Sequence, residues 1–408
     1  MMFPINKQRP PEMSKAWKIT WLDAADDIPE SMWDMCFPPP LEGRWWYKAL
    51  EMSGLDAQFQ FQYGVVSHTD RAIAIAPVFI MDVPITILAP PWLCSVIHAL
   101  KGIAPSLQFH RTVFVGSPCS DEGHVGILPG VDRMAVFITI QEALPERVAR
   151  FKATWLSWKD FPPRDISILQ GLQHRYGLFP VVCFPGTLCD LPGPGKMDYL
   201  ASLKGSRRHN LKKKWLRSAQ AVALDCEILQ HPDQATLDTI FALFSQTYEK
   251  AQVKFERLTR RFFELLAEES STHFIVLKEP KSDKIVAFML CFVFSNTMIN
   301  KFIGIDYHRP TEWLLYFRLW EAAVDWALGH GIRSIQSGQT GYGPKILTGH
   351  RLLPLTNYNR HKNPVMNWLY GKIAASVSWQ TIDADLAQHV RASSEEALMV
   401  KKICPNPP

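Results

Sequence analysis

Apolar and polar residues alternate along much of the chain. An alternation with a period of two residues is typical of strands that are buried on one face. In the first part of the sequence this alternation predicts strands at residues 17–22, 58–67, 71–81, 165–169 and 178–184. Apolar residues spaced by three or four positions predict helices at residues 44–52 and 141–152. The Pro- and Gly-rich stretch 88–130 has only weak patterns.

In the later part of the chain, segments with the two-residue period of strands alternate more clearly with segments that have the three- or four-residue spacing of helices. Strands are predicted at residues 222–229, 272–278, 284–294, 297–305 and 333–337. Helices are predicted at residues 234–250, 259–267 and 312–328. Strands and helices interleaved in this way predict a mixed α/β layer fold.

The length of the chain and one turn-rich segment predict two domains. A chain of 408 residues is long for a single hydrophobic core. Residues 185–196, PGTLCDLPGPGK, contain two Pro-Gly pairs and are expected to connect the halves. We therefore expect a disordered N-terminus over residues 1–16, a first domain over 17–190 and a second over 191–408.

Composition indicates a globular cytoplasmic protein. The longest apolar run, residues 285–294, is far shorter than the roughly 20 residues that span a bilayer. The N-terminus lacks the apolar core of a signal peptide. The eight cysteines contain no CxxC pair, so reduced thiols are expected rather than disulfides or a zinc site. No membrane insertion is expected.

Positive charge is concentrated in one segment. Residues 196–220 hold eight Lys and Arg against one acid, Asp198, a local balance of +7. The whole chain carries a net charge of +5, so the remainder sums to −2. Such a cluster is typical of a site for a polyanion: the phosphates of a cofactor, a nucleotide-linked substrate or RNA.

The spacing within this basic segment predicts two helices with a break at Gly205-Ser206, where Ser206 is the expected N-cap. Lys204, Arg208 and Lys212 would share one face. Arg207 and Arg208 would lie in the first turn, where the helix dipole disfavours cations unless an anion is bound. The alternative is a basic helix that is only solvated.

A glycine-rich segment, SGQTGYGPK at residues 337–345, follows the last predicted strand. Its glycines allow the backbone to approach a ligand closely, and Lys345 adds a positive charge. It is not a nucleotide P-loop, because Pro344 stands where that motif requires lysine. The alternative is a plain turn.

Covalent and metal chemistry have little support in the sequence. The thirteen histidines form no HExxH motif and no ligand-type cluster with carboxylates. No GxSxG motif marks a serine nucleophile. We therefore expect a site that binds and orients its substrates without a metal.

Two segments resemble the acyltransferase family related to the Fem peptidoglycan aminoacyltransferases, which are built from tandem GNAT-like (N-acetyltransferase) folds. The run YLASLKGSRRHNLKKKW resembles the start of that family's second domain, and AIAIAPVFI resembles its strand that runs into Ala-Pro. The run IDYHRPTEWLLYFRLWEAAVDWALGHGIRSIQSGQTGYGPKILTG is similar as well. Its matching positions are Leu314, Leu315, Gly331, Gly338, Tyr342, Lys345 and Gly349.

The resemblance implies two tandem GNAT-like domains, the first a degenerate scaffold, and amide formation on an amine from a phosphate-containing acyl carrier. The carrier would be acyl-CoA or aminoacyl-tRNA, and the acceptor a small-molecule or cell-wall-type amine. One departure concerns CoA: Arg309 fits the family's pyrophosphate loop, but Glu312 and Leu314 replace its glycines.

Roles for individual residues follow from that reaction. Arg207, Arg208, Lys212 and Arg309 are expected to bind the carrier or acceptor phosphates. Lys345 is expected to neutralise a phosphate or carboxylate near the reacting carbon, in a cleft shared with the basic helix. Asp306 is the candidate proton acceptor, and Tyr342 would orient the leaving group or donate to it.

A different class of function uses the same basic segment. The chain could be a non-catalytic protein on a GNAT-like scaffold that binds RNA or another polyanion, with Tyr199 and Trp215 as stacking surfaces. The residual charge of −2 leaves little positive surface elsewhere for this function.

Overall fold

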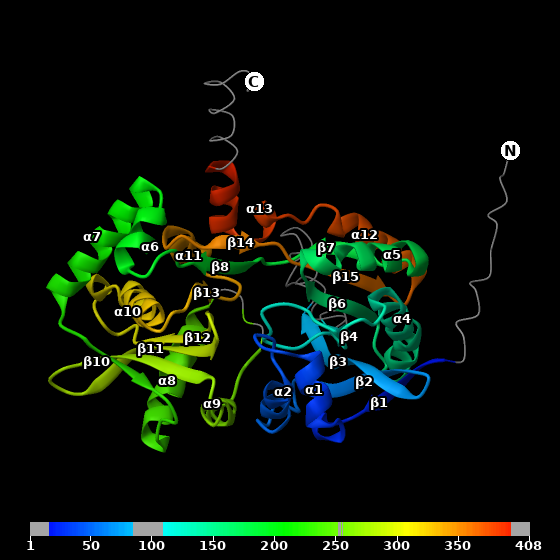
Figure 1. The fold of residues 1–408 in the computed structure, drawn as a ribbon. Coiled ribbons are helices and arrows are strands. Elements are labelled where there is room, and N and C mark those ends of the chain that lie inside the picture. The colour runs from blue at the N-terminus through cyan, green and yellow to red at the C-terminus, as the bar shows by residue number, and fades with distance from the viewer. Residues whose placement is uncertain (1–15, 85–108, 252–253, 255, 393–408) are drawn as a thin grey trace, which may run out of the picture.

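The computed structural model of the chain describes residues 16–84, 109–251, 254 and 256–392. Within these residues the strands form two mixed sheets that lie side by side (Figure 1). The predicted N-terminal disorder, part of the 88–130 stretch, Cys94 and Cys404 lie outside the described residues. Both the α/β fold class and the tandem arrangement are confirmed.

In the first sheet, the short strand β5 (Gly126–Ile127) lies outside the main strand order and pairs with β3 (Arg71–Pro84). In spatial order its other strands are β1 (Trp17–Leu22), β2 (Gln60–His68), β3 (Arg71–Pro84), β4 (Phe109–Val115), β6 (Trp155–Phe161), β15 (Thr356–His361) and β7 (Phe179–Val182). Only β4 and β6 pair in parallel.

The second sheet repeats this plan. In spatial order its strands are β9 (Asp225–Leu229), β10 (Thr272–Glu279), β11 (Lys284–Phe294), β12 (Thr297–Ile305), β13 (Ser334–Gln336), β8 (Gly186–Asp190) and β14 (Arg351–Leu353). Its one parallel pair, β12 with β13, occupies the same position in the order as β4 with β6. Each parallel pair needs a crossover, which is supplied by a helix.

The two sheets exchange one strand each. β8 precedes the basic segment but pairs with β13 and β14 in the second sheet, and β15 returns to pair with β6 and β7 in the first. The 185–196 segment is therefore partly a strand, where the sequence predicted only a connection. The division of the chain at residue 190 into two domains stays a prediction. β8, which ends at residue 190, belongs to the second sheet, and β15, after that residue, belongs to the first.

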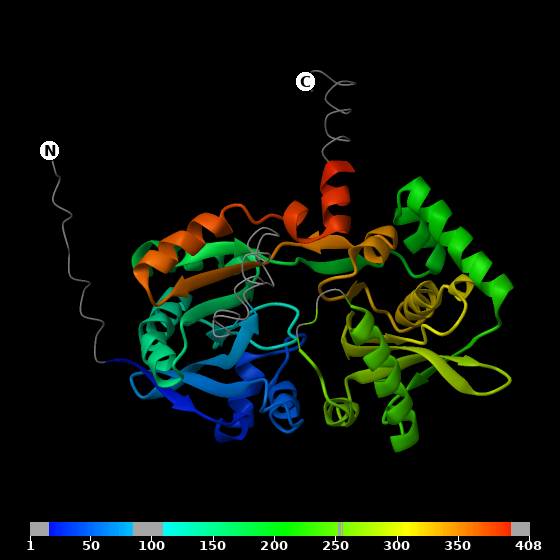
Figure 2. The ribbon, with the colours of Figure 1, turned by 180° about the vertical axis from the view of Figure 1, so that it is seen from behind.

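Helices cover both sheets, and the crossover helices are α4 and α10. In chain order the helices are α1 (Glu30–Cys36), α2 (Arg44–Glu51), α4 (Arg133–Arg150), α5 (Ile166–Tyr176), α6 (Lys196–Ser202), α7 (Gly205–Ala221), α8 (Gln234–Lys250), α9 (Arg260–Ala267), α10 (Leu315–Gly329), α11 (Tyr342–Leu347), α12 (Pro364–Ala374) and α13 (Trp379–Ile382). Short 3-10 turns are η1 (Ala25–Asp27), η4 (Pro163–Asp165) and η5 (Thr311–Trp313). Figure 2 shows α12, in orange, over the first half and α7, in green, at the far edge of the second.

Apolar packing joins the halves. One buried cluster contains the core of the first sheet together with α8, α9 and the face of the second sheet beneath them. At its centre the Trp45 and Trp46 rings lie 4.9 and 6.1 Å from the ring of Phe292. A second cluster fills the space between the other face of the second sheet and α6, α7 and α10. The two halves are thus held by a shared hydrophobic core.

No helix among the described residues is both long and apolar enough to cross a bilayer. The six described cysteines are free thiols.

Candidate functional site

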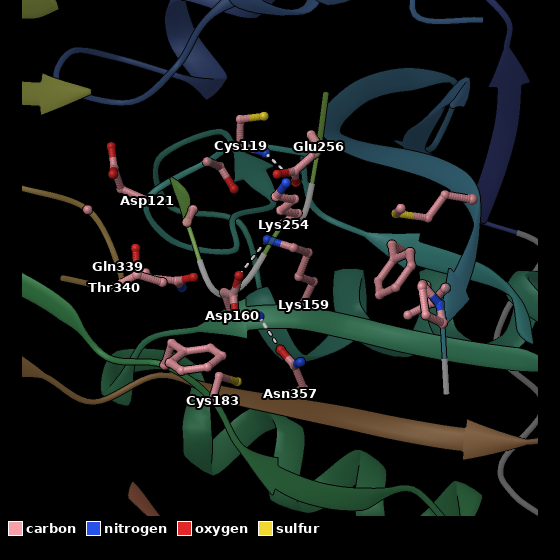
Figure 3. Close-up of a pocket in the computed structure, with 18 of the residues that line it drawn as sticks. Cys119, Asp121, Lys159, Asp160, Cys183, Lys254, Glu256, Gln339, Thr340 and Asn357 are labelled. Carbon is pink, nitrogen blue, oxygen red and sulfur yellow. Dashed lines mark hydrogen bonds and ion pairs between the residues drawn. The ribbon is translucent and has the colours of Figure 1, made fainter. Parts of the chain in front are cut away.

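A large pocket lies between the two halves, with a volume of about 910 Å³ (Figure 3). One wall is a face of the first sheet, to which β3, β4, β6, β15 and β7 contribute residues. The opposite walls come from β12, α8, α12 and the glycine-rich loop at residues 337–341. A pocket of this size between domains is the usual location of a substrate site.

The glycine-rich loop turns sharply between β13 and α11. Gly338, Thr340 and Gly341 have positive φ angles of 25°, 60° and 61°. This turn allows α11 to carry Lys345 back to the loop, where its Nζ donates to the carbonyl oxygens of Gly338 at 3.2 Å and Gln339 at 3.1 Å. The loop therefore positions the amine of Lys345 at the pocket wall.

The amine of Lys345 has unusual electrostatics. Among the described residues no carboxylate forms an ion pair with it, and burial lowers its pKa to about 7, with the Asp121 carboxylate only partly opposing. Burial disfavours the charged form of a lysine unless a partner compensates. Lys345 can therefore accept and release a proton near neutral pH, which an exposed lysine cannot do.

A buried histidine, His350, forms hydrogen bonds that hold the glycine-rich loop in place. His350 Nδ1 lies 3.0 Å from the carbonyl oxygen of Lys345, so Nδ1 carries the hydrogen and Nε2, 3.0 Å from Ser337 Oγ, accepts from the serine. Burial, aided by the charge of Lys345, lowers the pKa of His350 to about 3, so the ring is neutral. Asn300 Nδ2 also donates to Ser337 Oγ at 3.4 Å.

Charged residues cluster at the same end of the pocket. Lys159 Nζ lies 2.5 Å from Asp160 Oδ2, and Asp160 has a φ of 58°, uncommon for a residue other than glycine. Burial lowers the pKa of Lys159, but the Asp160 and Glu256 carboxylates outweigh it and raise the pKa to about 12. Figure 3 shows Lys159 pointing to Asp160, whose backbone N–H donates to Asn357 Oδ1.

A second buried cation joins the two halves at this end. Lys301 on β12 donates to Glu42 Oε1 at 2.6 Å and to Asp121 Oδ2 at 2.9 Å, and its side chain is only 2% exposed. Burial lowers its pKa, but the two carboxylates raise it well above the ordinary value of a lysine. Lys301 is therefore a fixed positive charge, in contrast to Lys345.

Several polar atoms that line the pocket have no hydrogen-bond partner among the residues that the structure describes. They are Trp155 Nε1, Ser157 Oγ, Tyr316 Oη and Gln339 Nε2. Burial raises the pKa of Tyr316, so its hydroxyl keeps its proton and can donate. Buried polar atoms without partners are rare, and four of them around one pocket indicate groups reserved for a ligand.

Of the seven residues singled out from the sequence, only Lys345 lines this pocket. Tyr342 begins α11 but is fully buried, and its hydroxyl donates to the carbonyl oxygen of Pro185 at 2.9 Å. Burial also raises its pKa well above the ordinary value. In this arrangement Tyr342 anchors α11 to the β7–β8 connection.

Asp306 and Arg309 pair with each other outside the pocket. Asp306 follows β12 as predicted, and its carboxylate accepts from Arg309 Nε at 3.1 Å and from the His308 N–H at 3.1 Å. Arg309 Nη2 also bonds Glu279 Oε2 at 3.1 Å. The neighbouring Ile305 and Tyr307 line the pocket, whereas Asp306 and Arg309 do not.

The basic segment forms two helices, α6 and α7, as predicted, but the break lies at Leu203 and Lys204, and Gly205 and Ser206 already belong to α7. The residue before the first turn of α7 is Lys204, and no side chain caps the helix, so the expected cap at Ser206 is wrong. Leu211, Trp215 and Ser218 are buried beneath α7, where it packs on α10, and Lys212 is exposed. Arg207 and Arg208 are half-buried, and none of residues 196–221 lines the pocket.

The cleft expected between the basic helix and the Lys345 loop is therefore absent. α7 contacts α11 outside the pocket, and Figure 1 shows α7 at the edge of the second half. The sequence analysis missed His350, Lys301 and Asn300 because each is a lone polar residue without a motif. Ser337 began the glycine-rich segment, but no role was predicted for it. A signal was present for Lys301 alone, as a charge inside an otherwise apolar strand.

The segment at residues 309–314 does not fit the pyrophosphate of CoA in the way that the glycine-rich pattern requires. Leu314 adopts a left-handed conformation with a φ of 48°, although it carries a side chain where the pattern has glycine. Arg309 is already paired with two carboxylates. Among the described residues no group of three His, Cys, Asp or Glu side chains is placed to hold a metal ion.

Comparisons with known proteins agree with this architecture. Residues 195–369, less than half of the chain, match the FemAB_like family, described as "Peptidoglycan biosynthesis/recognition". In the comparison with curated proteins, none matches the sequence significantly.

Solved structures resemble the chain at low sequence identity. The structure of FemX is similar over 87% of this chain and 100% of its own, with 10% identity and a TM-score of 0.54. A tandem GNAT protein from the clavulanic acid biosynthesis pathway aligns over 85% and 99%, with 10% identity and a TM-score of 0.49. L-PGS from Bacillus licheniformis aligns over 73% and 86%, with 11% identity and a TM-score of 0.45.

Proposed function

We propose that this chain, which has the Fem-like tandem GNAT fold, is an acyltransferase that forms an amide in the pocket between its two halves. The observation that carries the proposal is Lys345, a pocket-lining amine with a pKa of about 7 and no carboxylate partner among the described residues. Such a pKa is what proton transfer at neutral pH requires.

The reaction joins an amine to an activated acyl carbon. The bound acceptor ammonium gives a proton to neutral Lys345, and its nitrogen then attacks the acyl carbon. The new C–N bond forms as the bond from that carbon to the carrier oxygen or sulfur breaks. Lys345 releases this first proton to water, then takes the second proton from the nitrogen of the new C–N bond and passes it to the departing oxygen or sulfur. The amide, the carrier and Lys345 all end neutral, and one proton is released to solvent.

The pocket also supplies groups for the developing negative charge. Tyr316 Oη and Gln339 Nε2 line the same pocket and are donors without a partner in the described part of the chain. Donors fixed toward a developing oxyanion stabilise the transition state without reorganisation. The bonds from His350 to Ser337 and to the Lys345 carbonyl hold the loop that carries Gln339 and Lys345. In this proposal the proton-transfer role expected for Asp306 belongs to Lys345.

The carrier of the acyl group stays open between acyl-CoA and aminoacyl-tRNA, and the acceptor is a small-molecule or cell-wall-type amine. The poor fit of residues 309–314 to pyrophosphate favours aminoacyl-tRNA. The exposed cations of α7 support the same choice, because a surface helix suits an extended phosphate backbone better than a buried cofactor. Arg207, Arg208 and Lys212 would then contact the carrier away from the reacting carbon.

The test is a panel of acyl-CoAs and aminoacyl-tRNAs incubated with candidate amines, with the amide product measured by mass spectrometry. We expect product with one class of donor, and an increase in the melting temperature with that donor alone. The absence of amide product from every donor, together with tight, salt-sensitive RNA binding, would replace the proposal by the non-catalytic RNA-binding alternative.

A further inference from the structure

The part of the pocket against the first sheet differs in character from the end that holds Lys345. Along β3 and β4, alternate residues face the pocket: Phe79 and Met81 on one strand, with Phe114 opposite Phe79 on the next. The Phe79 and Phe114 rings stack with their centroids 4.7 Å apart. On β7 the alternate residues Phe179 and Val181 continue this wall. We call this region the sheet chamber.

The sheet chamber is closed on another side by α12. Ala374 is buried against Phe179 and Val181, and Tyr370 and Val377 pack against the same cluster. The Trp155 ring lies 4.8 Å from that of Tyr370. Apolar surface thus surrounds the chamber from the strands and from the helix that covers them.

Charge is segregated along the strands that cross the chamber. On β6 the pocket-facing residues run Trp155, Ser157, Lys159, from the apolar region to the charged end. Among the described residues the one charged side chain that lines the apolar end is Asp82, an exposed residue paired with Arg111 at 2.9 Å. The described residues of the chamber therefore offer a phosphate or carboxylate no cationic partner.

Among the described residues, two buried polar atoms of the chamber have no hydrogen-bond partner, whereas its histidine has one. His110 contacts Tyr370 Oη at 3.1 Å, and burial lowers its pKa to about 4, so it is neutral. The two unpaired atoms, judged within the described ranges, are Trp155 Nε1 and Ser157 Oγ. These two donors suit one carbonyl oxygen of an ester or amide within a chain that is otherwise apolar.

From these observations we propose that the sheet chamber binds a saturated aliphatic chain carried by one of the two substrates, with the reacting end of that substrate at Lys345. The assignment of the chain to a substrate of acyl transfer rests on the proposed function. The length of the chamber follows from β6, where Trp155 and Lys159 lie about 13 Å apart along the strand. A chain of about ten carbons spans that distance.

The chain could belong to the acyl donor or to a lipid acceptor, and the two sources share the same chemistry. The probes are therefore two series, saturated fatty acids and n-alkylamines of four to sixteen carbons, below their micelle concentrations. Binding to the full-length protein is measured by calorimetry. We expect affinity to rise about fourfold per methylene up to roughly ten carbons and then level off. A stronger rise in the acid series indicates the donor, and in the amine series the acceptor.

Variants of α12 test the location. Ala374→Phe fills the chamber, so it should lower affinity for the twelve-carbon probe at least tenfold while leaving the four-carbon probe unchanged. Ala375→Phe is the matched control, because Ala375 is adjacent but exposed and outside the pocket. If thermal unfolding shows that Ala374→Phe is not folded, Met81→Glu is used instead, because Met81 is half-buried in the same wall.

Affinity that is independent of chain length in both series would overturn the inference, as would equal losses in Ala374→Phe and Ala375→Phe. Because these are equilibrium measurements, they separate the two proposals. Amide formation with short substrates, without an effect of chain length on affinity, would contradict the proposal for the sheet chamber and leave the proposed reaction intact. Chain binding without amide formation by any donor removes the proposed reaction and leaves a lipid-binding site.

Discussion

At the scale of single residues, the site depends on an amine whose protonation is set by its surroundings. Lys345 faces two backbone carbonyls, whereas Lys159 and Lys301 in the same pocket face carboxylates. The three lysines therefore have different ionisation at neutral pH, although their sequence neighbourhoods do not indicate it. This difference is the basis of the proposal that Lys345 transfers the proton, whereas the other two are fixed charges.

The rate of acyl transfer should depend on pH through Lys345. Its free amine is the proton acceptor, so the rate should rise as pH increases through about 7 and then reach a plateau. Initial rates between pH 5.5 and 9 check this, with product release excluded by single-turnover measurement. A profile that is flat across pH 7, or that falls there, would assign the proton acceptor elsewhere.

Lys345 should also affect stability with a defined sign. Its pKa is about 7 in the folded protein and 10.5 in the unfolded chain, so between these values the unfolded state binds more protons. The free energy of unfolding should therefore rise with pH from 7 toward 10.5, by at most about 1.4 kcal/mol per pH unit from this group. Urea unfolding of the wild type and Lys345→Met at pH 7, 8 and 9 isolates the slope. Equal slopes in the two proteins would show an ordinary lysine.

Residue identities in the site were only partly predictable. Lys345 stood out because it follows a glycine-rich loop, which is a local signal. His350 and Ser337 meet through a hydrogen bond between a strand end and a loop, and no spacing in the sequence indicates that contact. Asp306 drew attention by its position after a strand and Arg309 by its fit to a pyrophosphate loop, yet the two pair with each other.

At the scale of elements, the pattern of apolar residues predicted the second sheet better than the first. β10, β11 and β12 are close to the predicted ranges, because consecutive antiparallel strands make their contacts locally. Residues 165–169 were predicted as a strand and instead form the start of α5, preceded by η4. A five-residue apolar pattern cannot separate a short strand from the first turn of a helix.

The strands exchanged between the halves could not be predicted from local sequence. β8 forms in a Pro- and Gly-rich segment because β13 and β14 lie on either side of it, both distant in sequence. β15 likewise forms between β6 and β7. Pairing with distant strands overrides local propensity, and this is why the segment predicted as a connection between the halves contains a strand.

The contact of β12 with α8 should be sensitive to a single methyl group. A Cβ added to Gly304 would lie 2.7 Å from backbone atoms of Leu243 and Phe244, which cannot move aside as a side chain can. Gly304→Ala should therefore lower the free energy of unfolding by about 1–3 kcal/mol. Gly329→Ala is the control, since no atom lies within 4 Å of the added methyl. Equal midpoints of urea unfolding for the two variants would contradict the packing described for β12.

At the scale of the whole molecule, an ion triad and an aromatic cluster hold the two halves around the pocket. Lys301 from the second sheet meets Glu42 and Asp121 from the first part of the chain, and lies 4.7 Å from the centroid of the Trp46 ring. The repeated sheet order and the exchanged strands tie the same halves together. The pocket is thus a product of the tandem arrangement, in which neither sheet forms it alone.

Removal of Lys301 should weaken the whole protein. Lys301→Met leaves two buried carboxylates without their partner and should cost about 3–5 kcal/mol in the free energy of unfolding. Lys18→Met is the matched control, because Lys18 pairs with Asp70 on the surface, where both side chains are mostly exposed. That change should cost less than about 1 kcal/mol. Similar losses in both variants would mean that the triad does not join the halves.

The most direct test of the account compares the effect of two lysines on amide formation. Lys345→Met and Lys212→Met each remove one positive charge, the first from the pocket wall and the second from the exposed face of α7. With the donor and amine found in the panel, at saturating concentrations, Lys345→Met should lower the single-turnover rate about 100-fold. Lys212→Met should stay within about twofold of the wild type, because it would contact the carrier and not the reacting carbon. Full activity in Lys345→Met would contradict the account.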